Sequence, residues 1–396
     1  MTRGRLPASV IALGVVSLLM DMSSELIHAL LPVFLVTSLG ASMVTVGLIE
    51  GLAEATAHLL KVFSGALSDY WRKRKPLILA GYGLAALTKP FFPLATMPVH
   101  ILAARLIDRV GKGIRGAPRD ALIADVTPES LRGSAYGLRQ SMDTMGAVLG
   151  PLAALGLMAL LNDDIRAVFW VAGVPAALAI AVILIWVREP PRVQAPDDGR
   201  EAAPRRFPLS RGALKQLPRT FVPLLVLAFL VHLARFSEAF LILRVQEAGL
   251  KLGWIPLVLI VMNISYTLSA WPLGRLADRW PPGRVLALGM GLLVVADLML
   301  ALGSGLPALF GGILVWGVHM GATQGVLSAM VAAEAPAGLR GTAFGLYNLV
   351  TGAALLLASV IAGGLWSSAG STFTFVAGAM LAGLAMLWQW RVARAA

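Results

Sequence analysis

Ionisable side chains recur at helical spacing inside the apolar stretches of this sequence. At about 100° per residue, Asp21, Glu25 and His28 fall within an arc of about 60°. Glu50 and Glu54 likewise share one face of the next apolar stretch. A carboxylate in apolar surroundings can take up and release a proton near neutral pH. We therefore predict proton exchange at five carboxylates: Asp21, Glu25, Glu50, Glu54 and Glu238.

A stripe of charges, mostly cations, follows in the segment 99–123. Its members would lie within an arc of about 120° on a helix. They are Arg105, Asp108, Arg109, Lys112, Arg115 and Arg119. An arginine side chain binds carboxylate or phosphate through two parallel hydrogen bonds. We therefore predict that an anionic solute is bound by the following cations: Arg109, Lys112, Arg115 and Arg139.

Charges at the centre of a bilayer cost about 2.5–3.5 kcal/mol each, so these side chains should face a wet cavity or one another. Arg139 and Asp143, at i and i+4, could form a purely structural pair. Buried pairs stabilise weakly, so the number of ions favours a cavity. The second half of the chain is less charged and is predicted to supply hydrogen bonds and apolar walls. Its candidate solute-binding residues are Asn263, Tyr266, His319, Gln324 and Asn348.

The composition is that of a membrane protein. Of 396 residues, 58% are hydrophobic and only 14% are charged, which a soluble chain of this size could not accommodate. The formal net charge of +12 comes from Lys and Arg at or inside apolar stretches, a pattern of membrane topology and not of nucleic-acid binding. The sequence has no cysteine, which excludes disulfides and thiolate metal sites. Without a nucleophile–base set or phosphate-binding loop, we predict no enzyme, cofactor or metal site.

Twelve apolar stretches are long enough to cross a bilayer, which takes about 20 helical residues. The first six are 9–37, 43–68, 76–95, 99–123, 134–160 and 166–187. The second six are 220–245, 254–277, 283–303, 306–330, 342–366 and 372–391. Cations interrupt the stretch 99–123, but its counterpart 306–330 is apolar. The predicted fold class is an all-α polytopic membrane protein with twelve transmembrane helices.

Two sequence motifs occur twice, at nearly the same separation. GALSD ends at Asp69 and returns as GRLAD ending at Asp278. LRGSAYGL begins at Leu131 and returns as LRGTAFGL beginning at Leu339. A fixed long period indicates a duplicated structural unit. Because both motifs keep their order, the two six-helix repeats are predicted to be parallel.

The repeat predicts an N-terminal six-helix bundle at 1–187, a cytoplasmic linker at 188–219 and a C-terminal six-helix bundle at 220–396. Loops on one side of the membrane, such as 72–75, carry most of the Lys and Arg, whereas those on the other side, such as 37–42, carry almost none. By the positive-inside rule, both termini lie in the cytoplasm. The predicted location is the cell (inner) membrane.

Twelve spans in two parallel repeats, with G-x-L-[AS]-D and nearby basic residues after the second and eighth spans, resemble the major facilitator superfamily of secondary transporters. The resemblance covers essentially the whole chain. It implies a monomer whose bundles rock about a mid-membrane site. Lys61 and Lys89 are further candidates for binding the anion, but Lys89 falls on a helix that is peripheral in the family, so snorkelling to the membrane surface is the alternative for it. The resemblance also implies a cytoplasmic gate made by these residues: Gly65, Asp69, Arg72, Gly274 and Asp278.

The segment from Gly146 to Pro151, GAVLGP, is similar to the antiporter motif of that family, G-x-x-x-G-P-x-x-G-G, but Ala154 and Leu155 replace its last two glycines. Packing of small residues beside a proline kink explains the segment equally well.

The expected function is secondary active transport of a small anionic organic solute by alternating access, coupled to protons. The partners are then the solute, protons and the lipid bilayer, without nucleic acid. One alternative is a proton-coupled efflux antiporter of amphipathic or cationic compounds. Another is a divalent metal transporter that uses side chains such as Asp21 and His28.

Overall fold

The computed structural model of the protein describes residues 6–71, 74–128, 131–189, 216–218, 221–336 and 339–395. Within these ranges every regular element is a helix, which confirms the predicted all-α class. Helices suit long apolar stretches because each backbone N–H finds its acceptor inside the same segment.

Each predicted span of the first half corresponds to one long helix or to two helices separated by a break. The breaks fall inside the first, third and sixth spans. The helices are α1 (Ala8–His28), α2 (Leu31–Thr37), α3 (Met43–Trp71), α4 (Lys75–Thr88), α5 (Phe91–Leu94), α6 (Pro98–Val126), α7 (Arg132–Leu160), α8 (Ile165–Val171) and α9 (Gly173–Trp186).

The second half repeats this order, and its first span is also broken. Its helices are α11 (Phe221–Ala234), α12 (Glu238–Glu247), the short 3-10 helix η2 (Leu252–Trp254), α13 (Leu257–Arg279), α14 (Pro282–Leu302), α15 (Leu306–Glu334), α16 (Arg340–Ala369) and α17 (Ser371–Ala395).

By length and composition, eleven spans in the described part of the chain could cross a membrane. The remaining predicted span, 99–123, corresponds to α6, which is helical over 29 residues. Its charges make it too polar to be recognised by composition. Its length still matches that of α15, its counterpart in the repeat.

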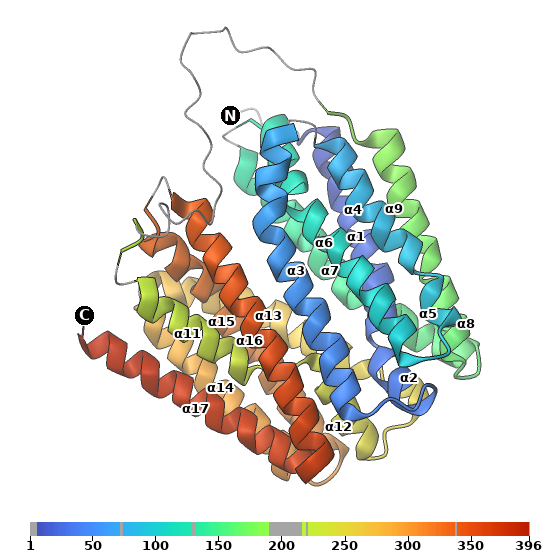
Figure 1. Ribbon diagram of the computed structural model, residues 1–396, viewed down its shortest axis with the longest axis vertical. Helices are drawn as coiled ribbons and strands as arrows, with labels where there is room; N and C mark the ends of the chain where they lie inside the picture. The colour runs from blue at the N-terminus through green and yellow to red at the C-terminus, as the bar shows by residue number, and fades with distance from the viewer. Residues whose placement is uncertain are drawn as a thin grey trace, which may run out of the picture.

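The helices α1–α9 lie on one side of the molecule and α11–α17 on the other (Figure 1). Between the two halves, α3 packs along α16, α7 packs against α13, and α2 contacts α12. The first of these contacts depends on small residues. A Cβ atom at Gly47 of α3 would be only 2.2 Å from the carbonyl oxygen of Ser359 on α16. The two helices therefore touch backbone to backbone at this point.

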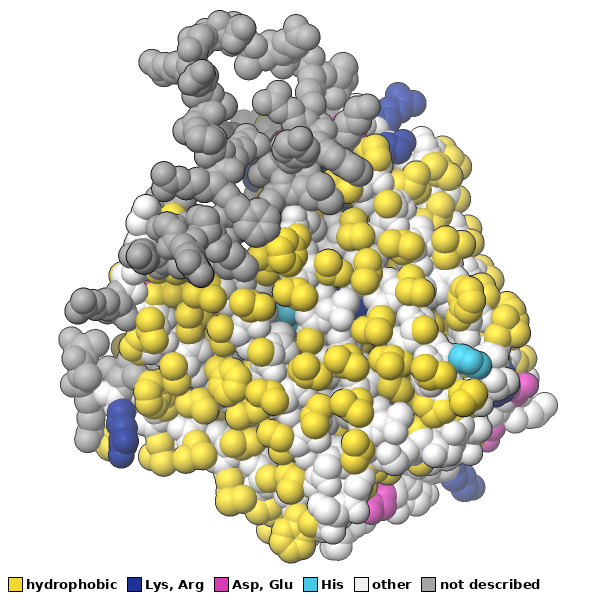
Figure 2. All heavy atoms as spheres, in the orientation of Figure 1, with side chains coloured by type: hydrophobic (Ala, Val, Ile, Leu, Met, Phe, Trp, Pro, Cys, Tyr) yellow, Lys and Arg dark blue, Asp and Glu magenta, His cyan; other side chains and the backbone are white. Residues whose placement is uncertain are grey.

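Large apolar side chains cover the outside of the molecule. Figure 2 shows hydrophobic side chains across most of the visible face, with few charges among them. Leu178, Trp186 and Leu387 are each more than half exposed. Such a surface is stable in lipid, so the ionisable groups described next lie in an interior enclosed by an apolar shell.

Candidate functional site

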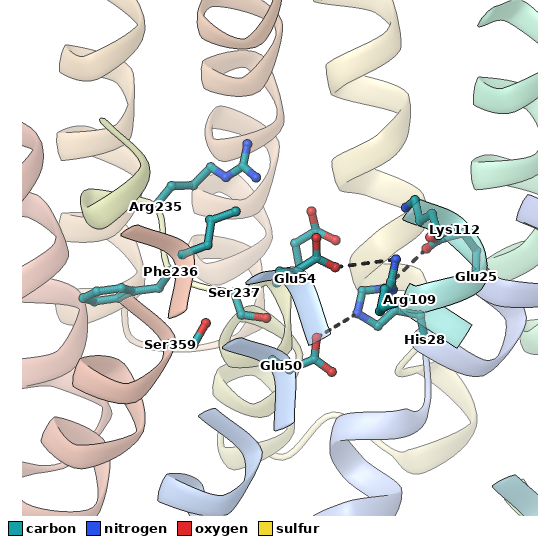
Figure 3. Close-up of a pocket in the computed structure, with 12 residues that line it drawn as sticks. Glu25, His28, Glu50, Glu54, Arg109, Lys112, Arg235, Phe236, Ser237 and Ser359 are labelled. Carbon is teal, nitrogen blue, oxygen red and sulfur yellow. Dashed lines mark ion pairs between the residues drawn. The ribbon is translucent and has the colours of Figure 1, made fainter. Parts of the chain in front are cut away.

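A cavity of about 170 Å³ lies between the two halves of the protein. Helices α1, α3 and α6 form one wall, while α16 and the break between α11 and α12 form the other (Figure 3). Ionisable side chains make up much of its lining. The lining residues are Glu25, His28, Glu50, Glu54, Arg109, Lys112, Arg235, Phe236, Ser237, Glu238, Leu355 and Ser359.

Breaks in two spans bring polar groups to this cavity. Helix α1 ends at His28, and α2 begins at Leu31. Helix α11 ends at Ala234, and α12 begins at Glu238 after Ser237, whose hydroxyl accepts the N–H of Ala239 at 3.3 Å. Irregular backbone at membrane depth is tolerated where it lines a hydrated cavity. Discontinuous helices of this kind form substrate sites in many transporters.

His28 lies between two carboxylates of the wall made by the first half. Its Nδ1 is 3.6 Å from Glu25 Oε2, and its Nε2 is 3.5 Å from Glu50 Oε2. Glu50 is also bound by Arg105, with 2.6 Å between Nη2 and Oε2. Glu50 is thus held from two sides, whereas the side chain of Glu25 keeps 25% of its surface exposed.

Arg109 and Glu54 form a looser pair at the cavity. Their closest nitrogen and oxygen are 3.5 Å apart. Both side chains line the cavity, but the glutamate side chain is 34% exposed and the arginine side chain only 6%, so the carboxylate is the more accessible of the two. The carboxylate of Glu54 can therefore contact solvent or solute while it stays paired with Arg109.

Three further lining residues are Lys112, Arg235 and Glu238. Within the described part of the chain they form no ion pair and no side-chain hydrogen bond. Figure 3 shows Lys112 and Arg235 on opposite sides of the cavity, with Glu54 between them. The cavity therefore presents cations from both halves to whatever occupies it.

Two predicted solute-binding cations, Arg115 and Arg139, are not among the lining residues. The guanidinium of Arg115 stacks on the ring of Tyr82 in α4, 4.4 Å from its centre. Arg139 binds Asp143 at 2.5 Å and approaches Asp120 at 3.6 Å. The i,i+4 pair considered from the sequence is thus present, and solute binding by these two arginines stays a prediction.

Asp21, the first of the predicted proton-exchanging carboxylates, also lies outside the cavity lining. It sits one turn before Glu25 on α1, where a Cβ atom at Gly146 of α7 would be 3.0 Å from its own Cβ. Gly150 packs in the same way one turn later, because a Cβ there would be 2.7 Å from that of Glu25. The glycines of the motif-like segment therefore hold α7 against the acidic face of α1.

The polar residues predicted in the second half have different positions. Two of them bridge the halves: Asn263 donates to the carbonyl of Ala147 at 3.0 Å, and Asn348 contacts His58 Nδ1 at 3.2 Å. Within the second half, the hydroxyl of Tyr266 donates to Gln324 at 3.4 Å. None of these lines the central cavity.

His319 is fully buried, and its Nδ1 contacts the carbonyl of Gly289 at 2.8 Å. Its packing inside the second half separates it from the central cavity. Solute binding by His319 stays a prediction, as it does for Asn263 and Asn348.

The side chain of Lys89 is interior, so the alternative that it snorkels to the membrane surface is wrong. It is 2% exposed, and its Nζ is 3.1 Å from both Asp108 Oδ1 and Ser24 Oγ. The buried carboxylate on α6 draws the ammonium inward. One member of the charged stripe thus serves to hold α4, α6 and α1 together.

The predicted gate falls largely outside what the structure describes. Arg72 lies outside the described residues, and the side chains of Gly65, Asp69 and Asp278 are likewise not described. Gly274 lies on α13, where it lines a second cavity of about 530 Å³ together with Tyr266.

Two ionisable residues of interest received no role from the sequence. Arg235 lies in the break before α12 and lines the central cavity. Asp297 lies on α14, is 3% exposed, and its Oδ2 has no hydrogen-bond partner within the described residues. A single aspartate inside the apolar stretch 283–303 was the available signal for it. Among the described residues, no three His, Asp or Glu side chains lie close enough to hold a metal ion.

The sequence matches the family model described as Major Facilitator Superfamily over residues 13–359 and 246–396. The chain belongs to this superfamily. An uncharacterized MFS-type transporter of Methanocaldococcus jannaschii is 32% identical over 95% of this chain and 93% of its own length. The protein is thus a multi-pass membrane transporter, as the sequence motifs predict.

Two further comparisons extend this result. The multidrug resistance protein MdtH of Photorhabdus laumondii is 32% identical, but over only 41% of this chain and 40% of its own length. The crystal structure of a point mutant of the nucleoside transporter NupG superposes with a TM-score of 0.77 at 14% identity, covering 98% of this chain and 99% of that one. The second likeness establishes the twelve-helix fold of the superfamily.

Proposed function

We propose that this Major Facilitator Superfamily protein transports a small anionic organic solute. The proposal rests chiefly on Lys112 and Arg235, which face one cavity from opposite halves without a counter-ion in the described part of the chain. An unpaired cation inside a membrane is costly. A carboxylate solute between the halves would neutralise both cations and provide bidentate contacts for the arginine.

Proton coupling is assigned to the carboxylates that reach the cavity. Glu25 and Glu54 are partly exposed and have counter-ions at 3.6 and 3.5 Å, so a proton can reach either one. Glu50 is enclosed by Arg105 and His28 and in this scheme orients the histidine. The proton-exchanging carboxylates proposed from the sequence also include Asp21, one turn before Glu25 on α1, and Glu238.

The moving parts are proposed to be the bundles 1–187 and 220–396, joined by the cytoplasmic linker 188–219. In support, α1 packs with α7 and α9 within the first half, and α14 packs with α15 and α17 within the second. Rocking of the halves would open the cavity to one side at a time. We further propose a monomer in the inner membrane with cytoplasmic termini and with neither catalytic activity nor nucleic-acid binding.

A thermal-shift screen followed by transport tests the proposal. A bound ligand raises the apparent stability by mass action, so organic acids should shift the melting of purified protein more than cationic drugs do. Labelled uptake of the best acid into proteoliposomes, with and without an imposed pH gradient, then measures coupling. Equal solute accumulation with and without the pH gradient would refute proton coupling. Larger thermal shifts with cationic drugs than with organic acids would refute the anionic solute.

A second candidate is proton-coupled efflux of amphipathic or cationic compounds. It is favoured by the partial likeness to a multidrug resistance protein and by the motif-like glycine Gly150, which packs directly against Glu25. The two cations without a counter-ion argue against it, because they would repel a cationic drug. The same screen separates the two candidates.

A further inference from the structure

We infer that the solute is amphoteric and carries an ammonium group in addition to its acid groups. This inference rests on the proposed function and deepens it. It starts from the lining residues that lack a counter-ion within the described chain, which are Lys112, Arg235 and Glu238. Two are cations and one is a carboxylate, so a complementary ligand has two anionic groups and one cationic group.

Other carboxylates of the cavity are less suited to bind the ammonium. Glu25 has His28 at 3.6 Å, and Glu54 has Arg109 at 3.5 Å. Glu50 already contacts Arg105 at 2.6 Å. Each of these would have to share its charge with a resident cation. Among the described residues Glu238 forms no ion pair, so an ammonium group of the ligand would not have to displace a paired side chain from it.

The local backbone places the acid and ammonium sites side by side. Arg235 lies in the break, and Glu238 is the first residue of α12. The N-terminal end of a helix favours a negative charge, so an acid group of the solute would be favoured beside Arg235. Lys112 faces the same cavity from α6 and would hold a second acid group. A compact amino dicarboxylate matches this arrangement, and its cationic group would bind Glu238.

This assignment is compatible with a proton-exchanging role for Glu238. When the solute leaves, the ammonium leaves with it, and the carboxylate can then be neutralised by a proton. The carboxylate of Glu238 would thus bind the ammonium group or a proton in turn, which couples release of the solute to uptake of a proton.

Four ligands with a five-carbon backbone test the inference on the purified full-length protein. Glutarate has two acid groups, glutamate adds an ammonium, 5-aminovalerate has one of each, and cadaverine has two ammonium groups. Affinities are measured by calorimetry or thermal shift at one ionic strength. Because a hydrogen bond to a charged group is strong, glutamate should bind about tenfold more tightly than glutarate.

The substitution Glu238→Gln supplies the decisive comparison. It should remove the advantage of glutamate and leave the affinity for glutarate unchanged or higher. Glu247→Gln is the matched control, because Glu247 lies at the other end of α12 and pairs with the neighbouring Arg244. This control should keep the wild-type order of affinities.

Each other outcome overturns the inference in a recognisable way. If wild-type protein binds glutarate as tightly as glutamate, or if Glu238→Gln keeps the preference, the ammonium site is wrong and the anionic solute stands. If cadaverine alone binds, the proposed function fails as well. Binding of none of the four refutes an amphoteric solute of this size.

Discussion

Arg105 and Glu50 form an ion pair with a nitrogen–oxygen distance of 2.6 Å, and their side chains are only 5% and 2% exposed. The pair joins α6 to α3 at the edge of the candidate solute cavity, which Glu50 lines and Arg105 does not. Glu50 in turn contacts His28 of α1 at 3.5 Å. The geometry of the cavity wall therefore depends on an interaction that no solute needs to touch.

Breaking this pair from either side should destabilise the protein strongly. Removing one partner of a buried pair typically costs about 3–5 kcal/mol, because the other charge stays buried. Glu50→Gln and Arg105→Gln should each lower the apparent melting temperature of the detergent-purified protein. The double variant should recover part of the loss, since neither charge then remains alone.

The pair between Arg244 and Glu247 is the matched control. It lies at 3.2 Å with the glutamate side chain 48% exposed, and exposed pairs contribute about 0–1 kcal/mol. Glu247→Gln should therefore leave melting nearly unchanged. Equal effects at Glu50 and Glu247 would show that the buried pair does not support the cavity wall.

Glu54→Gln should separate coupling from solute exchange. The amide cannot carry the proton, so accumulation driven by a pH gradient should disappear in proteoliposomes, whereas exchange of labelled for unlabelled solute should persist. The two assays are run on the same preparation. Equal loss of both activities would instead assign Glu54 to solute binding or to structure.

Two buried aspartates should respond in opposite ways to neutralisation. Asp108 pairs with Lys89 at 3.1 Å, and Asp108→Asn would leave that ammonium without its counter-ion. Asp297 is equally buried, and its Oδ2 has no partner among the described residues. Thermal unfolding should show a clear loss, again about 3–5 kcal/mol, for Asp108→Asn and little or none for Asp297→Asn. A larger loss at Asp297 would reveal an interaction of that carboxylate in the functioning protein.

The contact between α3 and α16 predicts a strong effect of a single methyl group. A Cβ at Gly47 would be 2.2 Å from the carbonyl oxygen of Ser359, whereas a Cβ at Gly83 on α4 would meet nothing within 4 Å. Gly47→Ala should therefore reduce transport by pushing the halves apart, and Gly83→Ala should not. Uptake in proteoliposomes at matched expression measures both, and full activity of Gly47→Ala would refute this close approach.

Helix positions followed well from the sequence, because long apolar stretches and a duplicated motif constrain them independently. The break after Ala234 was not predicted, although Ser237 is a good helix N-cap residue. The polar residues Arg235, Ser237 and Glu238 mark the break, but the apolar residues on both sides of them led to the prediction of one continuous span. The role of Arg235 depends on this break and was missed for the same reason.

The charged stripe on α6 shows why the site was predicted only in part. Arg109 and Lys112 reach the cavity, but Arg115 turns to Tyr82 on α4. A stripe about 120° wide faces more than one neighbouring helix, since α6 packs against both α3 and α4. Residue spacing alone identifies the charged face of the helix. Which of its charges contact another helix and which reach the cavity depends on how the helices pack.

A direct binding measurement tests whether cations from both halves bind one anionic solute. The ligand is the organic acid that gives the largest thermal shift in the screen, titrated into purified Lys112→Gln, Arg235→Gln and, as a control, the exposed Lys251→Gln. Each cavity variant should lose about tenfold or more in affinity, and the control should match wild type. Wild-type affinity in both cavity variants would show that Lys112 and Arg235 do not bind the solute.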